Sequence, residues 1–373
     1  MTKARDIADL GAVTSRLDTV GASDGALSNR NLIINGAMMI SQRGTSWSPP
    51  SDGYTIDRFQ QYQAGGGVIY YEQSTDAPDG FRNSLKLTVN TADTNIGTGD
   101  YYYLRHNIEG YNVAQLSLGT SAAKQFTLSF YVKSSLTGTF SGAFQNASVN
   151  RTYIFEYTIN SANTWERKTV TIAGDTTGTW STDNTAGLRV AFDLGMGAGF
   201  DGTSGSWTGT TKYSSTGSVK LVGTASATWQ ITGVQLEVGD TATPFEHRSF
   251  GDELARCQRY FYQTGNDNTP KYTPMATGWW RAATGGAAVQ THTFLPVQMR
   301  ATPSINVTGS NSQYLQSGSQ SSTCTYHALN SVSTNQVVWL DWNPAAAAAT
   351  NGISCVVGAS TTEAQWLRFD AEL

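Results

Sequence analysis

One stretch decides the fold, residues 229–262, which read W-Q-I-T-G-V-Q-L-E-V-G-D-T-A-T-P-F-E-H-R-S-F-G-D-E-L-A-R-C-Q-R-Y-F-Y. Its first ten residues space their apolar side chains as a strand does, and a change of phase at Gly233 predicts a β-bulge. Gly239 and Asp240 end this run, and Pro244 fixes the direction of the chain after it. We therefore expect the stretch to begin as a strand and then to turn.

The second half of the same stretch predicts a helix. Ser249 is a favourable N-cap, acidic residues follow in the first turn, and arginines lie near the end. Leu254, Cys257 and Phe261 recur at spacings of three and four, which places them on one helix face. We expect a helical hinge over residues 249–267, with these three side chains buried between two β units.

Length and composition indicate a β-rich chain of two or three domains. The 373 residues include 38 glycines and 11% aromatic residues, and only 14% are charged, against a usual share of about a quarter. Such a composition is typical of short antiparallel strands joined by tight turns. The net charge of −4 without a basic tract argues against a nucleic-acid partner. Because no run of about 18 apolar residues exists, we expect no membrane insertion.

The cysteines and the N-terminal sequence indicate a reducing compartment. Cys257, Cys324 and Cys355 are widely spaced and odd in number, which argues against a disulfide framework or a zinc site. The start M-T-K-A-R-D-I-A-D-L lacks the apolar core of a signal peptide. We therefore expect synthesis in a reducing cytoplasm.

Residues 1–30 differ from the rest of the chain. Apolar residues recur there every three or four positions, with charged residues between them, at Ile7, Leu10, Val13, Leu17 and Val20. So few turns do not form a stable isolated helix, but they suit a short dimeric or trimeric coiled coil or a docking segment. A frayed tail is the alternative interpretation.

The remaining chain predicts an all-β protein with two β units. From residue 31 to 248, alternating runs separated by turn residues indicate a β-sandwich, and they lie at 84–89, 124–133, 151–159, 166–172 and 187–194. No fixed period is present, which argues against a solenoid. After the hinge, residues 268–373 predict a second, C-terminal β domain from runs at 289–294, 303–308, 336–342 and 366–373.

Three motifs together resemble carbohydrate-binding-module jelly rolls of bacteriophage and prophage tail proteins. They are N-L-I-I-N-G-A-M-M-I-S-Q-R-G at 31–44, D-R-F at 57–59 and I-T-G-V-Q-L-E-V-G at 231–239. P-F-E-H-R and L-A-R-C-Q-R-Y, which follow, resemble the junction after such a jelly roll. The resemblance implies that the first and last strands pair.

The same resemblance implies a function and its partners. It implies a tail fibre or receptor-binding protein of the virion, made in the bacterial host cytoplasm, that recognises a host surface polysaccharide or lipopolysaccharide without catalysis. It also implies a homotrimer whose residues 1–30 attach to other tail proteins. Two alternatives remain open: a structural collar or baseplate protein, and a tailspike depolymerase.

No catalytic or cofactor motif is evident. The four histidines lack metal-ligand spacing, no G-x-S-x-G elbow exists, and we expect no enzyme activity and no required cofactor. A depolymerase needs two facing carboxylates, and Asp183, Asp193 and Asp201 lie in or near Gly-rich turns, where a turn role is the simpler interpretation. The run F-D-L-G-M-G-A-G-F-D-G at 192–202 would also suit one structural calcium ion.

Consecutive aromatic residues are the candidate binding residues. In a strand, alternate rings of Tyr101–Tyr103 and Trp279–Trp280 must leave the core, where they either stack on sugar rings or bury against a neighbouring subunit. We favour the subunit contact for the tyrosines. Tryptophans also flank Asp341 and occur in two polar loops, at Trp339, Trp342, Trp180 and Trp207.

The predicted glycan site lies in the C-terminal domain, because a protein anchored by its N-terminus presents its far end to the host. Its predicted residues are Trp279, Trp280, Tyr272 and Arg281. The arginine adds hydrogen bonds or meets an acidic sugar.

Overall fold

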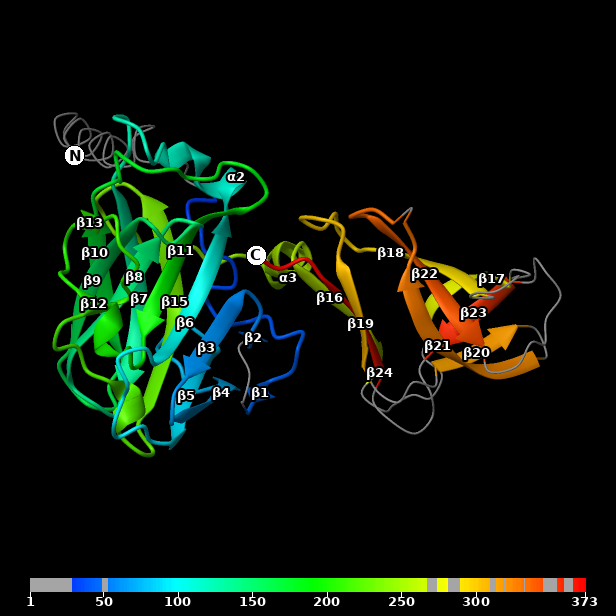
Figure 1. Ribbon diagram of the computed structural model, residues 1–373, viewed down its shortest axis with the longest axis horizontal. Helices are drawn as coiled ribbons and strands as arrows, with labels where there is room; N and C mark the ends of the chain where they lie inside the picture. Colours follow the sequence, from blue (N-terminus) through cyan, green and yellow to red (C-terminus); the bar gives the residue numbers. More distant parts are fainter. Residues whose placement is uncertain are drawn as a thin grey trace, which may run out of the picture. The chain divides into compact units, whose positions relative to one another are not determined.

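The computed structural model describes residues 29–48, 53–266, 274–280, 289–308, 313–317, 320–331, 333–344, 354–358 and 365–373. The chain divides into two compact units, residues 1–250 together with Leu373, and residues 251–372. Both units are built of β-strands, as the sequence predicts (Figure 1). The proposed coiled coil at residues 1–28 lies outside the described residues. None of the described helices is long and apolar enough to span a membrane.

The first unit is a jelly-roll sandwich of two antiparallel sheets (Figure 1). The six-stranded sheet has the order β1 (Ser46–Trp47), β4 (Val68–Ser74), β5 (Ser84–Thr91), β15 (Thr228–Val238), β7 (Phe126–Ser134) and β10 (Glu166–Ile172). The seven-stranded sheet has the order β13 (Trp207–Thr208), β9 (Thr152–Ile159), β8 (Gly138–Gln145), β11 (Ala186–Asp193), β6 (Tyr101–Glu109), β3 (Phe59–Ala64) and β2 (Gly53–Tyr54). This unit also contains a short parallel pair of strands, β12 (Asp201–Gly202) and β14 (Ser214–Ser215). Its described helical turns are α2 (Gly110–Val113), η1 (Ala114–Leu116), η2 (Ala198–Phe200) and η3 (Leu221–Gly223).

Alternation along the strands builds one core between the sheets. Each strand directs every second side chain inward, and the fully buried residues include Leu87, Phe130, Trp229, Leu104, Val190 and Phe192. The pairing of β15 with β7 shifts register between Thr232 and Gln235, and Gly233 has a φ of +61°. The bulge predicted at this glycine is confirmed.

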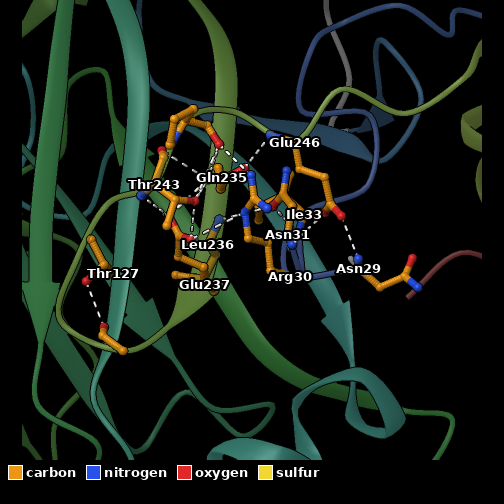
Figure 2. A network of polar contacts seen from close by, with 12 residues as sticks. Asn29, Arg30, Asn31, Ile33, Thr127, Gln235, Leu236, Glu237, Thr243 and Glu246 are labelled. Atoms are coloured by element: carbon orange, nitrogen blue, oxygen red, sulfur yellow. Dashed lines mark hydrogen bonds and ion pairs between the residues drawn. The ribbon is translucent and has the colours of Figure 1, made fainter. Parts of the chain in front are cut away.

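The opening motif lies along β15 but forms no strand of its own, and the first strand, β1, pairs with β4 (Figure 2). The prediction that the first and last strands pair is therefore wrong, although the opening motif is hydrogen-bonded to the last strand of the sandwich. The Leu32 backbone N–H donates to the Leu236 carbonyl at 2.8 Å. The Asn31 side chain donates to the Val234 carbonyl at 3.1 Å and accepts from the backbone N–H groups of Ile33 and Leu236 at 2.9 and 3.1 Å. The motif asparagine therefore satisfies the backbone groups that the bulge leaves unpaired.

Two glutamates of the closing motifs complete this network (Figure 2). The Glu246 carboxylate accepts from the backbone N–H groups of Asn29 and Asn31 at 2.5 and 2.9 Å. The Glu237 carboxylate accepts from the Thr243 backbone N–H at 2.9 Å and from its hydroxyl at 2.7 Å. The sequence motifs at the two ends of the sandwich thus hold each other in place.

The D-R-F motif has a similar structural role. The Asn35 side chain accepts from the backbone N–H groups of Met39 and Ile40 and donates to the carbonyls of Ile40 and Asp57. The buried Asp57 carboxylate accepts from the Gln42 backbone N–H at 2.9 Å. Burial raises the pKa of Asp57, although the charge of Arg43 opposes the shift.

The second unit contains a three-stranded sheet and a closed barrel (Figure 1). The sheet has the order β16 (Phe261–Asn266), β24 (Gln365–Asp370) and β19 (Ser304–Thr308). The barrel strands follow the order β17 (Pro274–Trp280), β18 (Val289–Phe294), β22 (Val337–Pro344), β21 (Gln320–Leu329), β20 (Gln313–Ser317) and β23 (Ser354–Gly358). Buried side chains fill its interior, among them Val289, Leu340, Trp342 and Val357.

The helix of the decisive stretch is shorter than the sequence predicts. α3 spans Phe250–Gln258, and Phe261 is the first residue of β16. Cys257 and Phe261 are buried, but Leu254 is only half-buried, so the prediction of a single buried three-residue helix face is wrong. The helix ends after Gln258 because the residues from Phe261 onward form β16 and pair with β24. A spacing pattern in the sequence does not show this pairing.

Candidate functional site

A group of aromatic side chains lies on the outer surface of the barrel, across β17, β18 and β22. Because strands alternate, the buried residues of β18 and β22 define the interior face, and the residues between them face outward. Trp279, His292, Phe294 and Trp339 occupy these outward positions and form the aromatic patch.

The strand register brings the four rings together. His292 pairs directly with Trp339, and Trp279 pairs with Gln290 one outward position along β18. The Trp279 ring lies 5.4 Å from Trp339 and 6.1 Å from His292, and His292 lies 5.4 Å from both Trp339 and Phe294. The two tryptophans and the histidine are half-buried, and Phe294 is 70% exposed. The patch is thus a row of rings that remains open to solvent.

Polar groups border the aromatic patch. Gln290 pairs with both Trp279 and Asp341 across the strands, and Thr277 pairs with His292, so all three polar side chains share the outward face. The Asn330 amide lies 3.3 Å from the Asp341 carboxylate. Carboxylate, amide and hydroxyl groups are therefore placed at the edges of the rings.

One ring atom in the aromatic patch lacks a partner. The Nδ1 atom of His292 is buried and makes no hydrogen bond with any described residue. A buried polar atom without a partner costs free energy, and this atom lies too deep for a ligand on the patch to reach it.

The backbone of Trp339 is hydrogen-bonded through both its N–H and its carbonyl. The Trp339 backbone N–H donates to the Ser333 hydroxyl at 2.9 Å, and its carbonyl accepts from the Asn330 backbone N–H at 3.0 Å. Gly278 lies between the strands so closely that a Cβ atom would sit 1.9 Å from the Gln290 carbonyl oxygen. A side chain at this position would therefore force the two strands apart.

Of the four predicted site residues, Trp279 is the one whose side chain the structure describes. Trp279 faces outward in the aromatic patch. Trp280, the last residue of β17, pairs with Val289, and its side chain is not among those described. Tyr272 and Arg281 also lie outside the described residues. His292 and Phe294 were missed, although the alternation of V-Q-T-H-T-F places both on one face.

The other aromatic candidates have structural roles. Tyr102 points into the core, where its hydroxyl donates to Asp93 at 2.8 Å, and Tyr103 is buried by rings of the same chain. Trp180 and Trp207 pack against each other at 5.4 Å, and each indole N–H donates to a backbone carbonyl. Trp342 is buried in the barrel and donates to the Thr291 hydroxyl at 2.8 Å.

The carboxylates of the Gly-rich run are occupied by protein donors. Asp193 is buried and accepts from three serine hydroxyls and from the backbone N–H groups of Gly195 and Met196. The Lys220 ammonium lies 3.7 Å from Asp193 and 3.1 Å from Asp201, so a lysine joins the two carboxylates considered for calcium. Among the described residues, no three His, Cys, Asp or Glu side chains are grouped as metal ligands.

The histidine of the closing motif packs among aromatic rings. The His247 ring lies 5.2 Å from Phe81 and 4.9 Å from Phe245. Aromatic packing accounts for its position.

Comparisons with known proteins place solved carbohydrate-binding modules and a tailspike among the similar structures. No protein-family model matches the chain, and no curated protein sequence matches it. The enzymatically active domain of tailspike protein 4 of bacteriophage CBA120 is 15% identical over 56% of this chain, with a TM-score of 0.33, and the match spans only 21% of that chain. A family 11 carbohydrate-binding module from Clostridium thermocellum, solved with a mixed-linked tetrasaccharide, is 11% identical over 54% of this chain and 98% of its own, with a TM-score of 0.28. A family 4 module is 17% identical over 55% and 98% of the two chains, with a TM-score of 0.29.

Proposed function

We propose that this protein binds a glycan through the aromatic patch of its barrel. The observation that carries the proposal is the open row of rings at Trp279, His292, Trp339 and Phe294, bordered by amide, carboxylate and hydroxyl groups. Sugar rings present apolar C–H faces that stack on aromatic rings, and hydroxyl edges that need polar partners. An exposed site of this composition suits such a ligand.

The biological setting follows from the sequence motifs. The protein acts as a tail fibre or receptor-binding protein of a bacteriophage and recognises a host surface polysaccharide or lipopolysaccharide without cleaving it. Residues 1–30 attach the chain to other tail proteins, and a homotrimer multiplies a weak single-site affinity by avidity. A structural collar or baseplate role is the second candidate, since the partly exposed rings could also meet a neighbouring subunit.

The experiment compares single ring deletions with a matched control. Trp339→Ala and Trp279→Ala should each weaken binding to a host polysaccharide about tenfold, because each removes a stacking surface. Tyr111→Ala, which removes a 62% exposed ring of the first unit, should bind normally. Binding is measured on a glycan array and by adsorption to host cells.

Oligomeric state separates the two candidates. Light scattering should show the same oligomer for the wild type and for both tryptophan variants. If the variants bind normally, or if they lose the oligomer instead, the rings pack between subunits and the structural role replaces glycan binding. Release of reducing ends from the polysaccharide would identify a depolymerase.

A further inference from the structure

The aromatic patch has a carboxylate beside it, and the barrel strands carry no positive charge to balance it. The six strands of the barrel contain no Lys, Arg or Glu and no Asp besides Asp341. The neighbours of Asp341 in β22, Leu340 and Trp342, are buried in the barrel, so Asp341 lies on the outward face together with Trp339. The charge that these strands present to a ligand is therefore negative.

The strand register places this carboxylate at the edge of the rings. Asp341 pairs with Gln290, which in turn pairs with Trp279, so the three residues form one row across the outward face. Trp339 lies two positions before Asp341 on the same face of β22, which corresponds to about 7 Å along the strand. A sugar ring that stacks on Trp339 therefore has the Asp341 carboxylate at its edge.

Asp341 has a neutral partner and no cationic one among the described residues. The Asn330 amide lies 3.3 Å from its carboxylate, and no described lysine or arginine forms an ion pair with it. By contrast, the Glu72 carboxylate of the first unit lies 2.6 Å from the Lys86 ammonium. Asp341 is half-buried, and a partly desolvated carboxylate is stabilised by any positively charged group that reaches it.

The tryptophan rings favour a ligand of the same charge. The face of an aromatic ring carries a negative partial charge, and tryptophan attracts a cation more strongly than the other aromatic residues do. Trp279 and Trp339 lie 5.4 Å apart at an angle of 77°, on the same outward face as Asp341. A cation near Asp341 would be attracted by both the carboxylate and the rings, whereas an acidic sugar would be repelled.

We propose that the aromatic patch selects an amino sugar whose nitrogen is not acetylated and carries a positive charge. The ammonium group binds the Asp341 carboxylate, and the C–H face of the sugar stacks on Trp339 or Trp279. The inference rests on the proposed function and names the class of glycan that the same site takes. It also separates that class from neutral and acidic polysaccharides, which the rings alone would not distinguish.

The test compares sugars that differ in charge and share a backbone. Isothermal titration of the full chain uses trisaccharides of glucosamine and of galactosamine, each beside its N-acetylated form, together with the galacturonate trisaccharide. At least one amino trisaccharide should bind about tenfold more tightly than its N-acetylated form, the size of one charge-assisted hydrogen bond. The galacturonate trisaccharide should bind more weakly than either form. High salt should reduce the preference, because it screens the attraction between the charges.

Variants of Asp341 assign the preference to this carboxylate. Asp341→Asn keeps the shape of the side chain and removes its charge, so binding of the amino trisaccharide should weaken about tenfold while that of the N-acetylated form stays the same. Asp341→Glu should retain part of the preference. The matched control Asp79→Asn removes an exposed carboxylate of the first unit and should bind like the wild type.

Trp339→Ala distinguishes failure of this inference from failure of the proposed function, because it should weaken binding of both sugar forms. If an N-acetylated or acidic trisaccharide binds as tightly as the amino form, or if Asp341→Asn keeps the preference, the inference is overturned while a loss in Trp339→Ala still supports the proposed function. If no trisaccharide binds, or if binding survives Trp339→Ala unchanged, both are overturned. If Asp341→Asn does not fold, the wild-type preference and its salt dependence decide.

Discussion

The motif network of Figure 2 and the arginine pair Arg105 and Arg189, on neighbouring strands β6 and β11, use polar groups in opposite ways. In the network, the carboxylates of Glu237 and Glu246 and the amide of Asn31 are engaged by backbone and side-chain partners, some of them more than 200 positions away in the sequence. In the arginine pair, both side chains face away from the sandwich core, and the Nε atom of each is buried without an acceptor. The motifs that are easiest to recognise in the sequence are therefore structural.

Removal of the central amide of the network should have the largest effect on stability. Asn31→Ala leaves two backbone N–H groups and one carbonyl without partners at the bulge, and each unsatisfied buried group costs about 1–3 kcal/mol. We expect the free energy of unfolding of the first unit to fall by about 3 kcal/mol or more. Urea unfolding, with hydrogen exchange of β15 amides to assign the transition, measures the loss. An effect no larger than that of the exposed control Asn90→Ala would show that water replaces the amide.

The second-largest expected effect is a difference in stability between variants of Arg151, which forms an ion pair, and of Arg189, which forms none with a described residue. Arg151→Gln leaves the buried Asp175 carboxylate without its charged partner, and we expect a loss of about 2–3 kcal/mol. Arg189→Gln removes a guanidinium that has no described partner and should change stability by less than about 0.5 kcal/mol or increase it. Equal losses for the two variants, measured in the same unfolding experiment, would contradict the distinction drawn here between the two regions.

The smallest expected effect concerns acid stability. Burial alone would raise the pKa of Glu246, but hydrogen bonds from the Asn31 and Asn29 backbones and the charge of Arg248 outweigh it and lower the pKa below 4.5. A carboxylate with a lowered native pKa stabilises the fold above its ordinary pKa, and this contribution is lost as the pH falls below about 4.5. Glu246→Gln should therefore be less stable than the wild type at neutral pH and approach it in acid. Thermal unfolding between pH 3 and 7, with the exposed Glu72→Gln as control, checks this convergence.

Local patterns predicted the strands and failed at the ends of elements. The run 166–172 coincides with β10, and the phase break at Gly233 located the bulge, because alternation and glycine geometry are local properties. The same kind of pattern extended the helix to Phe261, since a spacing of four residues also fits a buried residue at the start of a strand. Pairing with β24, about a hundred residues later, decided that boundary.

The sequence by itself determined an all-β chain, the inward and outward faces of its strands, and that one ring of the pair Trp279 and Trp280 faces outward. The tertiary structure alone decided which outward residues meet. Trp279, His292 and Trp339 come from three strands, and only the register of the barrel sets them 5.4–6.1 Å apart. Arg105 and Arg189 are likewise 84 positions apart and become neighbours through the pairing of β6 with β11. The period of a strand is a local property, whereas register depends on the partner strand, and a slip of one residue would turn every one of these side chains to the other face.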